Sequence, residues 1–253
     1  MNLAQTTIAA FILTTGVVGT AKAQEEAAAA AEPTLFCLKD FGFTETVNFY
    51  NYSNIPNTTE FIQNAHWSLS KDVTLDITVP FYTNGSTGLG MASVGLSAPV
   101  IQKPFSFMDS ISVGFDLKLP TSSADFGGDG VNPVVSLQTN GSTPVENIKW
   151  DAAFSYEWNS DGTFSPVLGG LVFDDVLQVS GSLSREIAKD WTLSANLHYT
   201  DGFDFGQVTT IGPALNWTAC PNAEFSLGID FPISDSESSD LTSVVGFSAS
   251  LKF

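Results

Sequence analysis

Residues 241–253 read LTSVVGFSASLKF, and this closing stretch is the best starting point for predicting the fold. Every second residue from Leu241 belongs to a mostly apolar set that ends on Phe253, and the residues between are small or polar. Because successive side chains of a strand point to opposite faces, this alternation predicts a strand with one apolar face. A strand of this kind occurs in a membrane barrel and also at the end of a soluble β-sandwich.

Composition narrows the classes of protein that remain. The chain has 253 residues with 27 acidic and 9 basic side chains, for a net charge of -18, and 43% of its residues are hydrophobic. The acidic balance argues against nucleic-acid binding, which needs a basic surface. The hydrophobic content argues against a disordered chain. The length suits one large all-β domain.

The N-terminal residues resemble a secretory signal. Residues 8–19 form an apolar core, and Ala21-Lys22-Ala23 is a small-x-small cleavage site, although no basic residue precedes the core. The alternative is a membrane anchor, for which the apolar run is short. We therefore predict a signal peptide over residues 1–23, a leader over 24–40 and a barrel over 41–253. No later stretch has the composition of a transmembrane helix.

From about Phe41 the sequence divides into segments of roughly ten alternating residues, the length that a tilted strand needs to cross a bilayer. About twelve such segments are expected, with approximate bounds 42–52, 60–70, 73–82, 89–101, 110–120, 145–158, 163–173, 176–187, 191–200, 205–218, 223–232 and 241–253. Because lipid offers no hydrogen-bond partner to an open strand edge, the sequence predicts a closed, antiparallel, up-and-down transmembrane β-barrel. In it, the first and last strands pair near Phe49.

The connections between the segments alternate in length, which favours the barrel over the sandwich. Residues 71–72, 159–162, 188–190 and 220–222 are expected to be tight turns at one end. Residues 121–143, 174–175, 201–204 and 234–240 are expected to be longer, acidic loops at the other end, without Lys or Arg. Trp67, Trp158, Trp191 and Trp217 lie near the expected turns and predict an interfacial aromatic belt. Loop 121–143 is long enough to constrict or cover the barrel.

Charged side chains on the inward face are the candidates for a selective pore. Asp116 and Lys118 are expected to lie across from Lys149 and Asp151 on the next strand, all near the end that carries loop 121–143. Asp76, Glu157 and Asp230 add negative charge to the lumen. The alternative is that these groups form a salt-bridge network that only fills a narrow barrel.

Histidine and cysteine suggest little further chemistry. His66 and His198 both point to the polar face on distant strands, and nothing nominates a metal site, a cofactor or a catalytic serine. Cys37 and Cys220 are an even pair in an exported chain, so a disulfide at the tight-turn end is possible. Sequence does not settle whether these two cysteines are bonded.

Residues 88–143 carry a family resemblance. They contain Gly88-Leu89-Gly90 at the start of a strand, an amphipathic hairpin, and Leu119-Pro120-Thr121 leading into a Gly- and Asp-rich loop. The stretch resembles the outer-membrane barrel family named for the MetA pathway of phenol degradation. Met91 and Ser122 stand where the family usually has Asp and Gly. The resemblance implies a porin-like transporter in the bacterial outer membrane, and it identifies no substrate.

These patterns lead to a functional hypothesis. The chain is predicted to be a non-enzymatic channel for passive passage of small solutes, including cations or small aromatic compounds. The alternatives are a hydrolase built on a barrel and a non-conducting, structural barrel. The predicted partners are membrane lipid, lipopolysaccharide and the small solute. The terminal strand resembles the signal that the barrel-assembly machinery reads, so that machinery is a predicted partner through Phe253.

Overall fold

The computed structural model describes residues 41–70, 72–145, 147–235 and 240–253. The predicted signal peptide and leader, including Cys37, lie outside the described residues. No helix among the described residues is long and apolar enough to cross a membrane.

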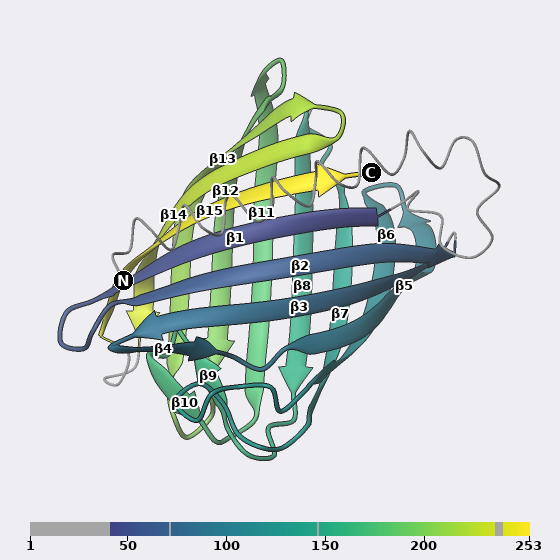
Figure 1. Cartoon of the computed structure of the whole chain (residues 1–253). Coiled ribbons are helices and arrows are strands. Elements are labelled where there is room, and N and C mark those ends of the chain that lie inside the picture. Colours follow the sequence, from purple (N-terminus) through teal and green to yellow (C-terminus); the bar gives the residue numbers. More distant parts are fainter. Residues whose placement is uncertain (1–40, 71, 146, 236–239) are drawn as a thin grey trace, which may run out of the picture. The chain divides into compact units, whose positions relative to one another are not determined.

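Twelve long antiparallel strands close into one barrel (Figure 1). They are β1 (Phe41–Tyr52), β2 (Thr58–Ser70), β3 (Val73–Asn84), β5 (Ser93–Phe105), β6 (Met108–Lys118), β7 (Asn132–Ser142), β8 (Ile148–Glu157), β11 (Val176–Ala188), β12 (Trp191–Asp201), β13 (Gln207–Cys220), β14 (Ala223–Asp235) and β15 (Leu241–Lys252). Each pairs with its neighbours in the chain, and β15 pairs with β1 to remove both sheet edges. Phe49 lies opposite Val245, which confirms the predicted closure.

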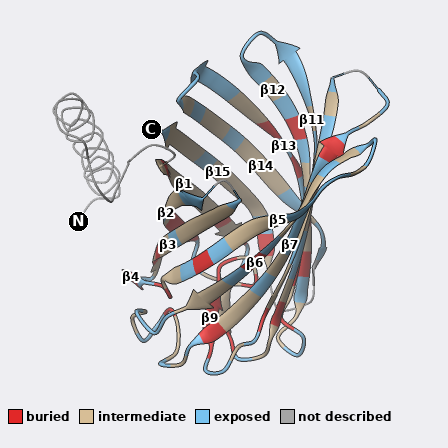
Figure 2. Ribbon diagram, turned by 90° about the vertical axis from the view of Figure 1, so that its right-hand side faces the viewer, coloured by how far each residue is buried: buried red, intermediate tan, exposed pale blue. Residues whose placement is uncertain are grey.

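The alternation of the sequence explains which side of the wall each residue occupies. On β3, Leu75, Ile77 and Val79 face outward, and Asp76 and Thr78 face the interior. Ile77 keeps 40% of its surface exposed, and large exposed apolar side chains occur on the outer faces of most strands. Figure 2 shows that most of the strand residues are exposed or only partly buried. Water makes such an apolar exterior unfavourable and lipid does not, so the outer surface is that of a membrane barrel.

Aromatic side chains gather at the end of the barrel that carries the tight turns. Trp191 stacks on Trp217 with a centroid distance of 5.8 Å, and Trp217 stacks on Phe225 at 5.6 Å. At the seam, Phe41 contacts Phe253, and the Phe253 backbone N–H donates to the Phe41 carbonyl. The described chain therefore begins and ends at the turn end, as an even number of strands requires.

Two segment assignments from the sequence are wrong, although the number of barrel strands is right. Strand β7 lies within the predicted loop 121–143. Its outward set includes Pro133, and Asn140 and Gly141 near its end are typical turn residues, so its alternation is weak. Residues 163–173 do not cross the barrel. They form a short hairpin of β9 (Thr163–Ser165) and β10 (Gly170–Val172), because Pro166 and Gly169 interrupt the apolar run.

These two errors also misplace one turn and one belt residue. The additional strand reverses the direction in which residues 148–157 run. Residues 159–162 therefore lie at the loop end, with Trp158 beside them, and not among the tight turns. The real turn-end connection is the segment between β7 and β8.

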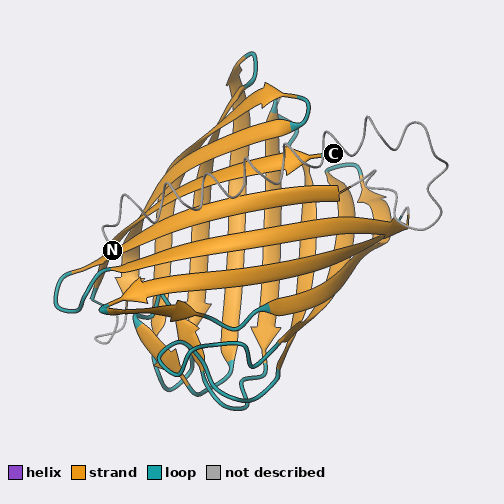
Figure 3. Ribbon diagram, in the orientation of Figure 1, coloured by secondary structure: helices purple, strands orange, loops and turns teal. Residues whose placement is uncertain are grey.

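The loop end of the barrel is covered by the chain itself (Figure 3). The hairpin β9–β10 with its connection 166–169, which we call the plug, lies across this end. Leu168 and Val172 of the plug pack with Tyr52 of β1, Val208 of β13 and three further buried side chains of the wall: Tyr50, Val176 and Leu241. Because β1 stands on the far side of the barrel from β8 and β11, the plug reaches across the lumen.

The loop 119–131 supports the plug from a second side. Phe126 of this loop and Phe164 of β9 lie 5.1 Å apart between ring centroids, and both pack on Tyr82 of β3. All three rings are buried. The prediction that this stretch covers the barrel is therefore partly right, because residues 119–131 contribute to the cover while residues 132–142 form the wall. The short strand β4 (Ser86–Leu89) pairs with β3 beside them.

Candidate functional site: the inner wall of the barrel

Two of the cavities formed by the described residues lie in the interior at different heights. We call the cavity nearer the loop end the upper one, although this end is at the bottom of Figure 1. It has a volume of about 430 Å³ and is bounded by Val167 of the plug. The rest of its lining comes from β1, β7, β8 and all the strands from β11 to β15. The lower one, about 440 Å³, lies toward the turn end. His198 lines both.

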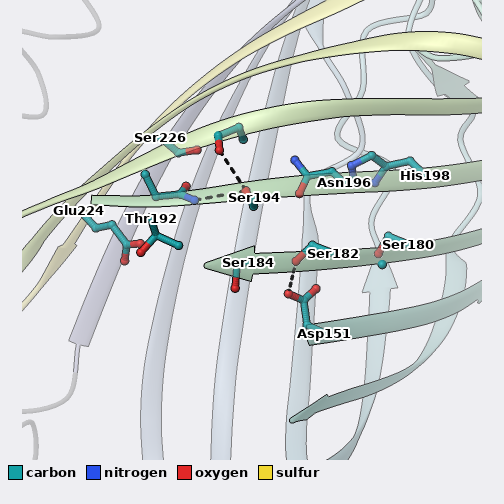
Figure 4. A pocket seen from close by; sticks show the side chains of 13 residues that line it. Asp151, Ser180, Ser182, Ser184, Thr192, Ser194, Asn196, His198, Glu224 and Ser226 are labelled. Carbon is teal, nitrogen blue, oxygen red and sulfur yellow. Dashed lines mark hydrogen bonds between the residues drawn. The ribbon is translucent and has the colours of Figure 1, made fainter. Parts of the chain in front are cut away.

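The lower cavity is dominated by hydroxyl and amide groups. Figure 4 shows the side chains that point into it from β8, β11, β12 and β14: Asp151, Ser180, Ser182, Ser184, Thr192, Ser194, Asn196, His198, Glu224 and Ser226. Ser182 donates a hydrogen bond to Asp151, and Asn216 donates to Ser194 at 3.4 Å. Small polar side chains leave space and bind water, so this part of the wall suits a hydrated solute.

Asp76 and Asp116 lie near each other although no ladder joins their strands. Gly95 of β5 stands between them, opposite Asp116 on one side and Asp76 on the other. A Cβ added to Gly95 would come within 1.7 Å of Asp116 Oδ1. The glycine therefore provides the room that the Asp116 carboxylate occupies, and the two acids form a negative patch on this side of the wall.

Lys118 is bound to Glu157, whereas the sequence predicted that it would lie across from Asp151. Lys118 Nζ donates to Glu157 Oε2 at 2.6 Å, the one ion pair among the described residues. Strand β7 separates β6 from β8, and the register places Lys149 and Asp151 toward the turn end, opposite Ser142 and Asn140. The expectation that Asp116 and Lys118 face Lys149 and Asp151 near the loop end is therefore wrong. Its cause is the missed strand.

Asn132 is a site residue that the sequence reasoning missed. It is completely buried, and its amide nitrogen donates to Glu157 at 3.1 Å and to Asn159 at 2.9 Å. Its oxygen accepts hydrogen bonds from the backbone N–H and the hydroxyl of Ser160. Asn132 thus joins the Lys118–Glu157 pair to the root of the plug. The alternation of residues 132–142, if recognised, would have placed it on the inward face.

Glu60 of β2 is a second residue without a sequence prediction. It is 6% exposed and accepts hydrogen bonds from Tyr50 Oη at 2.8 Å and Asn48 Nδ2 at 2.9 Å. Tyr82 lies directly opposite it on β3. Nearby, the hydroxyl of Tyr52 donates to the carbonyl of Pro166 and so holds the plug to β1.

Asp230 and the two histidines complete the inward-facing charged groups. Asp230 of β14 borders the upper cavity and interacts electrostatically with His198. His66 lies opposite Asp76, far from His198. Among the described residues, no three His, Cys, Asp or Glu side chains are grouped as a metal site requires. Cys220 is exposed at the turn end, and its pairing with Cys37 stays a prediction.

A family comparison identifies the group of proteins to which this barrel is related. The family model described as "Putative MetA-pathway of phenol degradation" matches residues 39–243, which is most of the chain. The chain belongs to this family. The match confirms the resemblance seen at Gly88-Leu89-Gly90 and Leu119-Pro120-Thr121.

Solved structures share the fold of this MetA-pathway family member. The KdgM porin matches with a TM-score of 0.56 at 13% identity over 84% of this chain and 99% of that chain. The NanC porin gives 0.57 at 10% identity over 83% and 98%. An outer membrane channel from Pseudomonas putida F1 gives 0.55 at 11% identity over 88% and 98%. No curated protein matches in sequence. Family and fold together place the chain among the outer-membrane β-barrels.

Proposed function

We propose that the protein is a passive outer-membrane channel for small solutes, with a preference for cations over anions. The observation that supports this is the charge of the inner wall. Carboxylates face inward from β2, β3, β6, β8 and β14: Glu60, Asp76, Asp116, Asp151, Glu157, Glu224 and Asp230. Two inward-facing lysines, Lys118 and Lys149, offset only part of this charge, and Lys118 is bound to Glu157. A low-dielectric wall lined by one sign of charge concentrates ions of the opposite sign.

The charge of the loop end also favours cations over anions. Asp125, Asp129, Asp161, Asp174 and Asp204 lie in its connections, and the described connections at this end contain no Lys or Arg. Lys103 and Lys189 lie at the turn end. A solute that approaches the plug therefore meets a negative mouth. The same carboxylates would also bind divalent ions at a lipopolysaccharide surface, so we propose lipopolysaccharide as a partner. We also propose the barrel-assembly machinery as a partner.

Conductance of the refolded protein in planar bilayers tests the proposal. In a KCl gradient we expect a reversal potential of the sign that indicates K⁺ preference. Asp116→Asn and Asp151→Asn should reduce this preference, because each removes a charge from the inner wall. Glu45→Gln is the matched control, since Glu45 lies on the outward face of β1.

Two results would contradict the channel. Absence of any conductance from correctly folded protein would favour the non-conducting barrel. Hydrolytic activity that disappears in His66→Ala or His198→Ala would favour the enzyme, because a channel needs neither histidine for chemistry.

A further inference from the structure

The upper cavity is chemically different from the lower one. Around it stand Asn48, Gln138, Gln178, His198, Thr210 and Asp230 as polar groups. Its apolar contacts come from Val167 of the plug, Val208 of β13 and Val244 of β15. Val208 is 1% exposed and packs in the cluster below Leu168. The cavity is thus lined by both apolar and polar side chains, and Val167 supplies an apolar contact from the plug.

Asp230 is the one carboxylate among the side chains around this cavity, and no Lys or Arg of the described chain borders it. Its Oδ1 is buried and has no hydrogen-bond partner among the described residues. The oxygen lies above Gly212, where an added Cβ would approach it to 2.5 Å. Because this oxygen packs against Gly212 without a donor, the carboxylate is poorly compensated. A ligand that brings a positive charge and N–H groups to the part of Asp230 that lines the cavity therefore gains from binding here.

The surroundings of Asp230 also determine the rest of the ligand. Val244 lies directly opposite Asp230 on the neighbouring strand, so an apolar surface begins beside the carboxylate. The volume of about 430 Å³ is at the small end of the range for ligand pockets, about 300–1,000 Å³. A compact ligand with one cationic end and one short apolar end matches both features.

We infer that the cavity below the plug is a binding site for small primary alkylammonium ions. The ammonium group donates to Asp230, and His198 and Asn48 line the same cavity. The alkyl group contacts Val167 of the plug and Val244 of β15. This inference rests on the proposed channel function, because it names the class of solute that the lumen holds before release.

Ligand-observed NMR titration of the detergent-solubilised, full-length protein tests the site with n-butylammonium and with uncharged 1-butanol. Butylammonium is expected to bind at least tenfold more tightly than 1-butanol. Asp230→Asn should weaken butylammonium at least tenfold and leave 1-butanol unchanged. Glu224→Gln is the matched control, because it removes a carboxylate from the lower cavity and should leave butylammonium binding unchanged.

A second variant separates the apolar contact from the charge. Val167→Thr keeps the shape of the side chain and replaces a methyl group by a hydroxyl, so it should weaken butylammonium several-fold and leave methylammonium unaffected. Equal binding of butylammonium and 1-butanol, or undiminished binding to a folded Asp230→Asn protein, would overturn the inference. A barrel that binds butylammonium without conducting would contradict the channel alone, and one that conducts without binding it would contradict the site alone.

Discussion

Lys118 and Glu157 show how strongly one residue depends on another inside the wall. Glu157 is 5% exposed, and Lys118 supplies the positive charge that compensates it. Lys118→Met should lower the free energy of unfolding by about 1–3 kcal/mol, because a buried carboxylate then lacks its counter-ion. Urea unfolding in detergent micelles measures this. Lys149→Met, at the turn end, should change stability by less than about 0.5 kcal/mol, and an equal loss in both variants would refute the role of the pair.

Glu45 is a charged residue on the outward, lipid-facing side of β1. It faces outward between Phe43 and Val47, with Ala249 and Gln63 as its cross-strand neighbours. A carboxylate on the lipid face is unfavourable, so Glu45→Leu should raise the free energy of unfolding by about 1 kcal/mol in lipid vesicles. Val47→Leu, an apolar exchange on the same face, should give no comparable gain. A loss of stability in Glu45→Leu would mean that the carboxylate has a partner of its own.

At the scale of elements, the plug is the feature that controls access to the lumen. The hydrogen bond from Tyr52 to Pro166 joins it to β1. Removing one hydrogen bond costs about 0.5–1.5 kcal/mol, so Tyr52→Phe should raise the frequency of opening about 2- to 10-fold in single-channel records. Tyr199→Phe loses hydrogen bonds to Asp201 and Gln207 outside the plug and should leave opening unchanged. No difference between the two variants would show that this bond does not hold the plug.

At the scale of the whole molecule, closure depends on the pairing of the first and last strands. Phe253 stacks on Phe41 with centroids 6.0 Å apart and hydrogen-bonds to its carbonyl. Deleting Phe253 should reduce the yield of inserted barrel much more than the conductance of each barrel that does form. Phe253→Tyr keeps the ring and should restore the yield. If the chain that ends at Lys252 inserts as efficiently as the full protein, the role of the terminal ring in assembly is refuted.

The sequence by itself predicted the barrel because lipid imposes a local rule that each strand must satisfy. Alternation at β3, β6, β12 and β15 separates apolar and polar faces without reference to any other strand. Closure then follows from the need to satisfy strand edges, so the pairing of β1 with β15 was predictable as well. The inward direction of Asp76, Asp116 and Asp230 follows from the same rule.

Which inward residues meet was decided only by the tertiary structure. Whether a segment crosses the membrane or folds over the barrel depends on what packs against it. The apolar side chains of residues 163–173 pack against Tyr52, Phe126 and Val208 instead of lipid. Missing β7 changed the direction of β8, which moved Asp151 away from Lys118 and brought Glu157 to it. Local alternation determines the face of each residue, and its height and neighbours depend on strand count and register, which are properties of the closed sheet.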